Sequence, residues 1–316
     1  MTTRHLVDPE LLPMLDMFPA LEISPGTLAA IRAGMDQMSK ASPIPDAPVD
    51  VAERYIAGAE GAPDVRLLIY VPRGTAARRA GFLHIHGGGY VMGTPEMSDA
   101  RNRLLAADIG CVVVSVDYRL SPETPHPGPV EDCYAALKWL HANAAALDVD
   151  PARIAIGGES AGGGLAASLA LLARDRGEVP VAFQLLIYPM LDDRTAAAEP
   201  HPYTGEYVWT PPANRFGWAA LLGHEPGVDG VSPYAAAARA ESLAGLPPAF
   251  ISIGALDLFI DENLDYARRL ARDGVPVEMH LYPGAFHGFN MMAGASVSQA
   301  FERDYREALR RALGGG

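Results

Sequence analysis

Arg153-Ile-Ala-Ile-Gly157 is a short apolar run, and Gly158-Glu-Ser-Ala-Gly162 follows it directly. The alanine- and leucine-rich residues that come next favour a helix. A strand that turns sharply into a helix strains its central residue and leaves no room for side chains on either side, which fits the glycines at 158 and 162. Such a turn would raise the Ser160 hydroxyl above the sheet, at the positive N-terminus of the helix.

A glycine-rich turn with an incidental serine is the alternative, because G-x-S-x-G also occurs by chance. The flanking strand and helix patterns favour a nucleophile, and no lysine is present to make the loop a P-loop. Ser160 is therefore the predicted catalytic nucleophile.

Outward from this motif, strand-like apolar runs alternate with helical patterns. Strands are expected at 51–57, 65–71, 81–86, 111–117, 153–157, 181–188, 249–254 and 277–282. Helices are expected at 24–39, 98–108, 130–143, 161–175, 261–273 and 296–313. This alternation indicates a mainly parallel α/β sheet with helices on its faces.

One long segment, residues 190–246, breaks the alternation. It is rich in proline and aromatic residues and links two strands, and an insertion of that length is usually functional. We expect residues 1–45 and 190–246 to form a cap. Residues 46–189 and 247–316 are then the first and second parts of the core.

A second motif, His86-Gly87-Gly88-Gly89, ends an apolar strand. Acyl transfer creates a tetrahedral oxyanion, which backbone N–H groups can stabilise only if the chain comes close. Consecutive glycines allow that approach, so the amides of Gly88, Gly89 and Ala161 are the predicted oxyanion hole.

Metal binding by His84 and His86, two residues apart on one strand face, is the alternative. No further ligands lie nearby in the sequence, so we expect no metal and expect His84 to be packed or bonded to the backbone.

A base and its orienting acid should follow the serine in the order serine, acid, histidine. Asp257 lies just past the expected strand at 249–254, and His287 just past the one at 277–282. Both therefore fall at carboxyl ends of strands, where open α/β sheets build their sites. Asp261 and Glu262 compete with Asp257, but they fall in the next helical pattern and are interpreted as first-turn charges favoured by the helix dipole.

Together these motifs resemble the hormone-sensitive-lipase-like family of bacterial carboxylesterases. The resemblance covers nearly the whole chain from about residue 65 and rests on these segments: His86-Gly-Gly-Gly-Tyr90, Asp117-Tyr-Arg-Leu120, Gly158-Glu-Ser-Ala-Gly162, Gly245-Leu-Pro-Pro248, Asp257 and Tyr282-Pro-Gly-Ala-Phe-His-Gly288. It implies an α/β-hydrolase fold, with a mainly parallel eight-stranded sheet flanked by helices and a helical cap. Two departures stand out: Glu159 replaces the usual Asp or Thr, and the segment after Leu120 diverges from the usual pattern.

The implied activity is hydrolysis of small to medium carboxylic esters through an acyl-enzyme, without a cofactor. An amidase or peptidase with the same triad stays open, as does a non-catalytic small-molecule receptor on the same fold, although receptors of that kind lack the catalytic histidine. Tyr90, Trp209, Phe216 and Phe18 are candidates for an apolar substrate pocket. Dimers are common in the family, and the oligomeric state is left open.

Composition agrees with a globular enzyme. A net charge of −13 at pH 7 repels phosphate backbones and anionic lipids, so no nucleic-acid or membrane partner is expected. No secretory leader or transmembrane stretch is recognisable, and two cysteines form no disulfide framework. We therefore expect a cytoplasmic protein.

Overall fold

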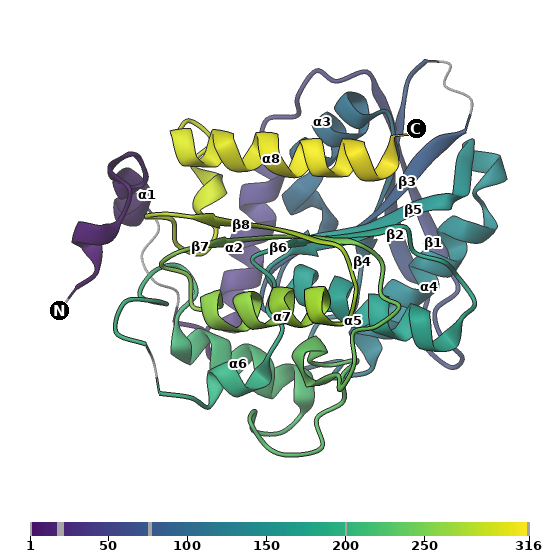
Figure 1. The fold of residues 1–316 in the computed structure, drawn as a ribbon. Helices are drawn as coiled ribbons and strands as arrows, with labels where there is room; N and C mark the ends of the chain where they lie inside the picture. The colour runs from purple at the N-terminus through teal and green to yellow at the C-terminus, as the bar shows by residue number, and fades with distance from the viewer. Residues whose placement is uncertain (1, 18–21, 75–77, 200, 315–316) are drawn as a thin grey trace.

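The computed structural model describes residues 2–17, 22–74, 78–199 and 201–314. Within these ranges eight strands form one sheet in the order β1-β2-β4-β3-β5-β6-β7-β8 (Figure 1). The strands are β1 (Val49–Ile56), β2 (Val65–Pro72), β3 (Arg79–Ile85), β4 (Val112–Asp117), β5 (Val149–Glu159), β6 (Phe183–Ile187), β7 (Ala249–Gly254) and β8 (Val277–Tyr282).

Strands β3 to β8 all run in one direction, whereas β2 is antiparallel to both β1 and β4. In the central pair, Ile85 of β3 lies opposite Gly158 of β5. The carboxyl ends of the parallel strands therefore meet at one edge of the sheet, and the two glycine motifs leave the sheet side by side.

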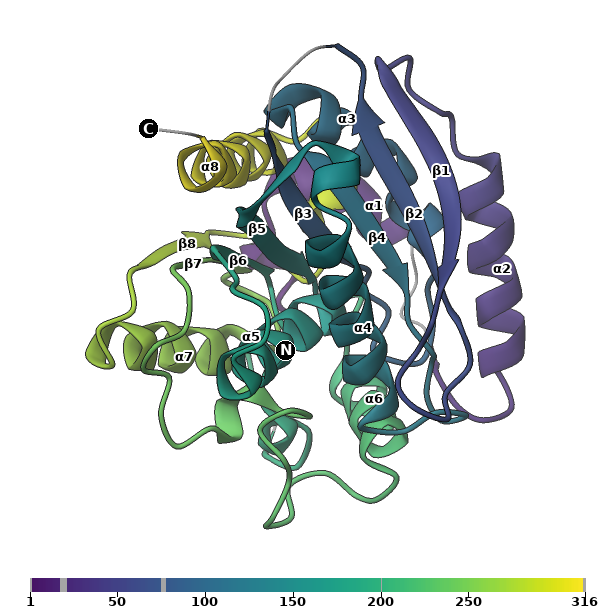
Figure 2. The same cartoon turned by 90° about the vertical axis from the view of Figure 1, so that its right-hand side faces the viewer.

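Helices cover both faces of this sheet (Figures 1 and 2). Helices α3 and α8 pack on one face, and α4, α5 and α7 pack on the other. The helices are α1 (Leu12–Met17), α2 (Leu28–Ala41), α3 (Asp99–Ile109), α4 (Gly128–Ala142), α5 (Ala161–Arg176), α6 (Pro211–Leu222), α7 (Ile260–Arg272) and α8 (Ser296–Leu313). The buried strands carry continuous apolar runs because both of their faces are covered.

The observed elements follow the sequence pattern closely. The bounds of β7, β8 and α8 match the expected ranges residue for residue. Helix α2 begins later than expected because Ser24 and Thr27 close a turn before it: the Ser24 amide donates to Thr27 Oγ1 at 2.9 Å. Two helices, α1 and α6, lie in segments for which the pattern gave no helix.

The first residues of the chain lie against loops from distant parts of the sequence. The Thr3 amide and hydroxyl both donate to Glu206 Oε2 at 2.6 Å, which joins the N-terminus to the 190–246 insertion. The Asp8 amide donates to the Gly284 carbonyl at 3.0 Å, in the loop that follows β8. Residues 3–8 therefore contact both the insertion and the loop that carries His287.

Helix α2 is attached to a different part of the core. It contacts the short 3-10 helix Pro95–Ser98, and Arg32 donates to the carbonyls of Val91 and Ser121 at 2.7 and 2.8 Å. Arg32 also pairs with Glu123. Helix α2 thus lies beside the chain that follows the glycine loop.

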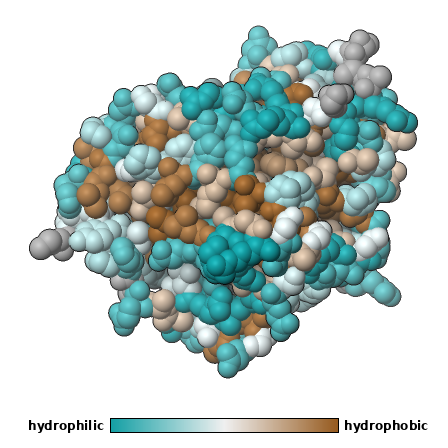
Figure 3. All heavy atoms as spheres, in the orientation of Figure 1, coloured by the Kyte–Doolittle hydropathy of each residue, from teal (hydrophilic) through white to brown (hydrophobic). Residues whose placement is uncertain are grey.

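An apolar band crosses the face shown in Figure 3, over β8 and between α7 and α8. Strand β8 is the last strand of the sheet, and its Leu281 side chain is exposed. The band is therefore the open edge of the sheet.

Two further features concern the cysteines and the character of the helices. Cys111 and Cys133 are buried and unpaired. Among the described helices, none has the length and apolar character needed to cross a membrane.

His86 is a buried histidine at the end of β3. Its ring stacks on Tyr118 with centroids 4.3 Å apart, and Nδ1–H donates to the Gly87 carbonyl at 2.8 Å. Burial lowers the pKa of His86 to about 4, against the smaller opposing effect of the Gly87 hydrogen bond. The folded protein therefore holds this imidazole in its neutral form.

We predict that this histidine makes stability fall in mild acid. The unfolded chain takes up the proton near the ordinary pKa of about 6.5, before the folded chain does. The part of the free energy of unfolding that depends on His86 is fully present above that pH. It decreases by about 3 kcal/mol as the pH falls toward 4. Urea titrations at pH 7, 5 and 4 measure it. His86→Gln should be less stable at pH 7 yet lose less on acidification, and parallel losses in both proteins would contradict the assignment.

Candidate active site

Ser160 lies in the sharp turn between β5 and α5. Its backbone angles are φ 56 and ψ −121, a conformation that side chains rarely adopt. A Cβ at Gly158 or at Gly162 would lie 2.1 Å from the Ile85 carbonyl oxygen. Both glycines are therefore required by the close approach of this turn to the end of β3.

Ser160, His287 and Asp257 form a chain of hydrogen bonds. His287 Nε2 lies 2.9 Å from Ser160 Oγ, and His287 Nδ1 lies 2.8 Å from Asp257 Oδ2. Asp257 is fully buried, and its other oxygen accepts the Phe259 amide at 3.0 Å. The carboxylate thus fixes the histidine with Nδ1–H as donor, which leaves Nε2 to accept from the serine hydroxyl.

The two rival acids occupy the first turn of α7, as expected, but they differ from each other. Asp261 is exposed. Glu262 is buried, and it accepts the Leu191 amide at 2.7 Å and the Thr195 hydroxyl. Burial raises the pKa of Glu262 well above its usual range. Glu262 therefore does more than complement a helix dipole, because it holds the start of the insertion against α7.

The glycine loop after β3 is tightly turned beside the serine. Gly88 and Gly89 have φ values of 119 and 60, in the region that favours glycine. The Gly88 carbonyl accepts the amides of Val91 and Met92, so the N–H of Gly89, in the same trans peptide, points the opposite way. Ala161 begins α5, where an amide has no partner within its own helix. Among the backbone hydrogen bonds of the described residues, the amides of Gly88, Gly89 and Ala161 have no acceptor, and their role as an oxyanion hole stays a prediction.

The strand histidine His84 is bonded differently from expectation. Its Nδ1 lies 2.9 Å from Ser115 Oγ, and its Nε2 lies 3.2 Å from Glu159 Oε2. Its partners are therefore side chains and not the backbone. His84 is buried, so the packed alternative is confirmed. The side-chain partners were not predicted, because Ser115 and Glu159 lie on neighbouring strands, far from His84 in sequence.

Aromatic rings surround His287 on several sides. Ring centroids of Tyr188, Phe259 and Trp209 lie 4.8, 5.2 and 6.4 Å from the imidazole. Sequence reasoning missed Tyr188 and Phe259, although each lies just past the end of a strand, where site residues are expected. His287 and Ser160 are consequently only 6% and 7% exposed.

The structure describes three of the four predicted pocket residues, and their surroundings differ. Trp209 lies against the glycine loop, since a Cβ at Gly89 would lie 2.0 Å from its indole. Phe216 is half-buried on α6. Tyr90 is fully buried and donates to the Met190 carbonyl at 2.9 Å, so it supports the core and lines no open pocket. Phe18 lies outside the described residues.

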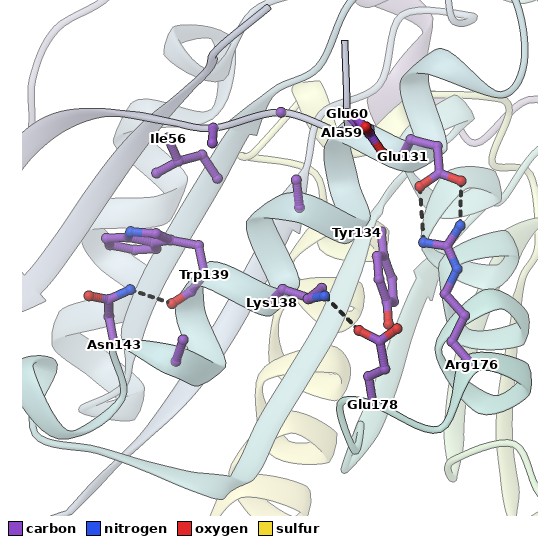
Figure 4. Close-up of a pocket in the computed structure, with 14 residues that line it drawn as sticks. Ile56, Ala59, Glu60, Glu131, Tyr134, Lys138, Trp139, Asn143, Arg176 and Glu178 are labelled. Atoms are coloured by element: carbon purple, nitrogen blue, oxygen red, sulfur yellow. Dashed lines mark hydrogen bonds and ion pairs between the residues drawn. The ribbon is translucent and has the colours of Figure 1, made fainter. Parts of the chain in front are cut away.

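A cavity of about 530 Å³ lies elsewhere, between α4 and the end of β1 (Figure 4). Its lining includes Ile56, Tyr134, Trp139 and Arg176 and none of the site residues above. The candidate active site is therefore identified by the side chains around Ser160 and not by the volume of a cavity.

Comparison with known proteins agrees with this geometry. A family model described as alpha/beta hydrolase fold matches residues 82–291. Carboxylesterase NlhH of Mycobacterium tuberculosis is 37% identical over 314 residues, which cover 97% of this chain and 96% of the relative. Esterase LipI of the same species is 36% identical over 331 residues, covering 98% of this chain and 96% of that protein.

Among solved structures, a bacterial heroin esterase superposes with a TM-score of 0.92 at 42% identity, covering 99% of this chain and 100% of the other. Esterase LipW from Mycobacterium marinum superposes with a TM-score of 0.85 at 33% identity, with coverages of 99% and 98%. The chain therefore belongs to the alpha/beta hydrolase fold family, within its hormone-sensitive-lipase-like group of bacterial carboxylesterases.

Proposed function

We propose that this carboxylesterase works through Ser160 as nucleophile, His287 as general base and Asp257 as the acid that orients the base. The observation that supports this most strongly is the continuous hydrogen-bond chain from Ser160 Oγ through His287 to Asp257. Its order along the chain is the serine, acid, histidine order of this fold.

In the first half of the reaction, Ser160 Oγ attacks the ester carbonyl carbon while its proton passes to His287 Nε2. The negative charge that forms on the carbonyl oxygen is stabilised by the amides of Gly88, Gly89 and Ala161. His287 then gives its proton to the leaving alcohol oxygen as the C–O bond breaks, which leaves an acyl group on Ser160.

In the second half, a water molecule transfers a proton to His287 and attacks the acyl carbon. A second oxyanion forms in the same hole, and its collapse releases the acid and returns the proton to Ser160. Asp257 stays ionised throughout and stabilises the imidazolium. No step requires a cofactor.

We also propose that residues 1–45 and 190–246 cap the site. Trp209 from the insertion lies on the glycine loop, and Tyr207 contacts Phe286 beside His287 with ring centroids 5.6 Å apart. The N-terminal residues bond to Glu206 in the same insertion. These contacts support a cover over Ser160 that a substrate must displace.

The proposed substrates are esters with a short acyl group. Trp209 occupies the space beside Gly89, and its Nε1–H donates to Asn214 Oδ1 at 3.2 Å, which holds the ring in place. A fixed indole next to the proposed oxyanion hole leaves little room for a long chain. The likeness to a heroin esterase supports the same choice, because heroin is an acetate ester of a bulky alcohol.

A cytoplasmic location and a homodimer are further proposals. The two buried, unpaired cysteines are consistent with a reducing compartment. The apolar open edge at β8 is consistent with an interface between two copies.

The nucleophile is tested by Ser160→Ala, which should abolish ester turnover and leave the melting temperature nearly unchanged. A fluorophosphonate should add to wild-type protein at Ser160 and should not add to the variant. Ser168→Ala is the matched control and should remain fully active, because Ser168 is a second buried serine, within α5. Labelling that persists in Ser160→Ala would contradict the assignment.

The acid is tested by comparing two aspartates four residues apart. Asp257→Asn should lower kcat by about 10⁴-fold, the scale known for this change in serine proteases, because it forces the wrong histidine tautomer. Asp261→Asn should stay close to wild type, because Asp261 is exposed. If Asp261→Asn is the damaging change, the choice of acid is wrong.

The short-acyl preference is tested by Trp209→Ala. Removing the indole should raise the ratio of kcat/KM for p-nitrophenyl octanoate over acetate, by roughly tenfold or more. Trp209→Phe keeps a ring in place and should change the ratio much less. Tyr203→Ala, an exposed position of the same insertion, serves as control. An unchanged ratio in Trp209→Ala would remove Trp209 from the acyl site.

A further inference from the structure

A charged cluster is buried directly behind the proposed nucleophile. Glu159, the residue before Ser160, is 8% exposed. One of its carboxylate oxygens accepts from Arg101 Nη1, and the other lies 3.2 Å from His84 Nε2. Three elements thus meet at one side chain, because Arg101 lies on α3, His84 on β3 and Glu159 at the end of β5.

The hydrogen bonds of this cluster converge on the carboxylate of Glu159. Burial raises the pKa of Glu159, but Arg101 and then His84 outweigh it and hold the pKa at about 2. An ionised carboxylate can only accept, so His84 Nε2–H donates to it. Asn102 Nδ2 lies 3.3 Å from the other ring nitrogen of His84.

The position of the cluster matters more than its contribution to stability. A buried ion pair gains little net stability, because desolvation offsets the attraction. Glu159, however, joins the two strands whose ends hold the reacting groups: β5 leads into Ser160, and β3 leads into Gly88 and Gly89. The Cα of Gly87 also approaches the Glu159 carbonyl, which lies 2.9 Å from the position of a Gly87 Cβ.

We propose that Glu159, held by His84 and Arg101, is a positioning residue that sets the placement of Ser160 Oγ relative to the oxyanion amides. The proposal rests on the proposed function of Ser160, Gly88 and Gly89. The two groups sit on separate strands, and the pairing between β3 and β5 ends at Gly158, whereas the pairing of β5 to β6 continues to Glu159. The carboxylate of Glu159 therefore adds a side-chain tie from the turn to β3 and α3, the side on which the oxyanion amides lie.

This placement affects the transition state more than substrate binding. The ground-state ester makes few contacts to the oxyanion amides, whereas the tetrahedral intermediate depends on them. Glu159→Gln keeps the side-chain volume but sets an NH₂ group against Arg101 or against the His84 N–H. A misplacement of the order of 1 Å should then lower kcat by about 10- to 100-fold and leave KM within about twofold of wild type.

The test measures kcat, KM and the inhibition constant of an aryl trifluoromethyl ketone, which forms a tetrahedral adduct with an active serine. In Glu159→Gln the inhibition constant should rise by the same factor as kcat falls. Glu159→Asp keeps the charge and should recover part of the lost kcat. Arg101→Lys, which keeps the positive charge, should show a smaller loss of the same kind and replaces Glu159→Gln if that variant does not fold.

Asp132→Asn is the matched control, because Asp132 is fully buried and accepts three hydrogen bonds from Arg119, two from the guanidinium at 2.7 and 2.8 Å and one from the amide at 2.9 Å. It should lower the melting temperature while kcat stays near wild type. If Glu159→Gln behaves like this control, or changes KM in place of kcat, the positioning role is overturned. A wild-type enzyme that the ketone does not inhibit would instead count against the proposed function of Ser160 itself.

Discussion

The backbone of Ser160 is the constraint on which the rest of the site depends. A non-glycine residue at φ 56 stores strain of about 1–3 kcal/mol, which the surrounding structure must offset. The Ser160 amide donates to the Ile187 carbonyl at 2.9 Å, and its carbonyl accepts the Met190 amide at 3.0 Å. The turn is thus held by β6 as well as by the end of β3. Any side chain at 158 or 162 would push it away from the end of β3.

A second requirement is a dry environment for the ion pair that forms during catalysis. Asp257 has no exposed surface, and the rings of Tyr188 and Phe259 lie against His287 in edge contacts. Coulomb interactions strengthen as water is excluded, so the carboxylate stabilises an imidazolium more here than it would at the surface. The same enclosure is consistent with the place of the cavity in Figure 4, which lies away from Ser160.

The sequence predicted the fold and the place of the reacting groups because both rest on local patterns. The family and the mainly parallel sheet are confirmed, and the structure brings Ser160, Asp257 and His287 together as expected, their roles remaining proposals. Contacts between side chains distant in sequence were not predictable. Arg101 and Glu159 are 58 residues apart, and His84 and Glu159 are 75 apart. In the sequence, Glu159 was visible only as a departure from the family motif. Tyr90 was predicted to line the pocket because periodicity does not distinguish a buried aromatic ring from one that lines a pocket.

Two segments near the start of the chain are hydrogen-bonded to loops that carry proposed catalytic groups. Arg32 donates to the Val91 carbonyl beside the glycine loop, and the Asp8 amide donates to the Gly284 carbonyl before His287. The insertion is held at its start, where the Leu191 amide donates to Glu262 of α7. A change in the proposed cap would therefore also act on these loops. The tetrahedral intermediate tolerates little displacement of the groups that hold it. We therefore infer that the substrate range of this chain can change through side chains such as Trp209 only if these backbone hydrogen bonds are kept.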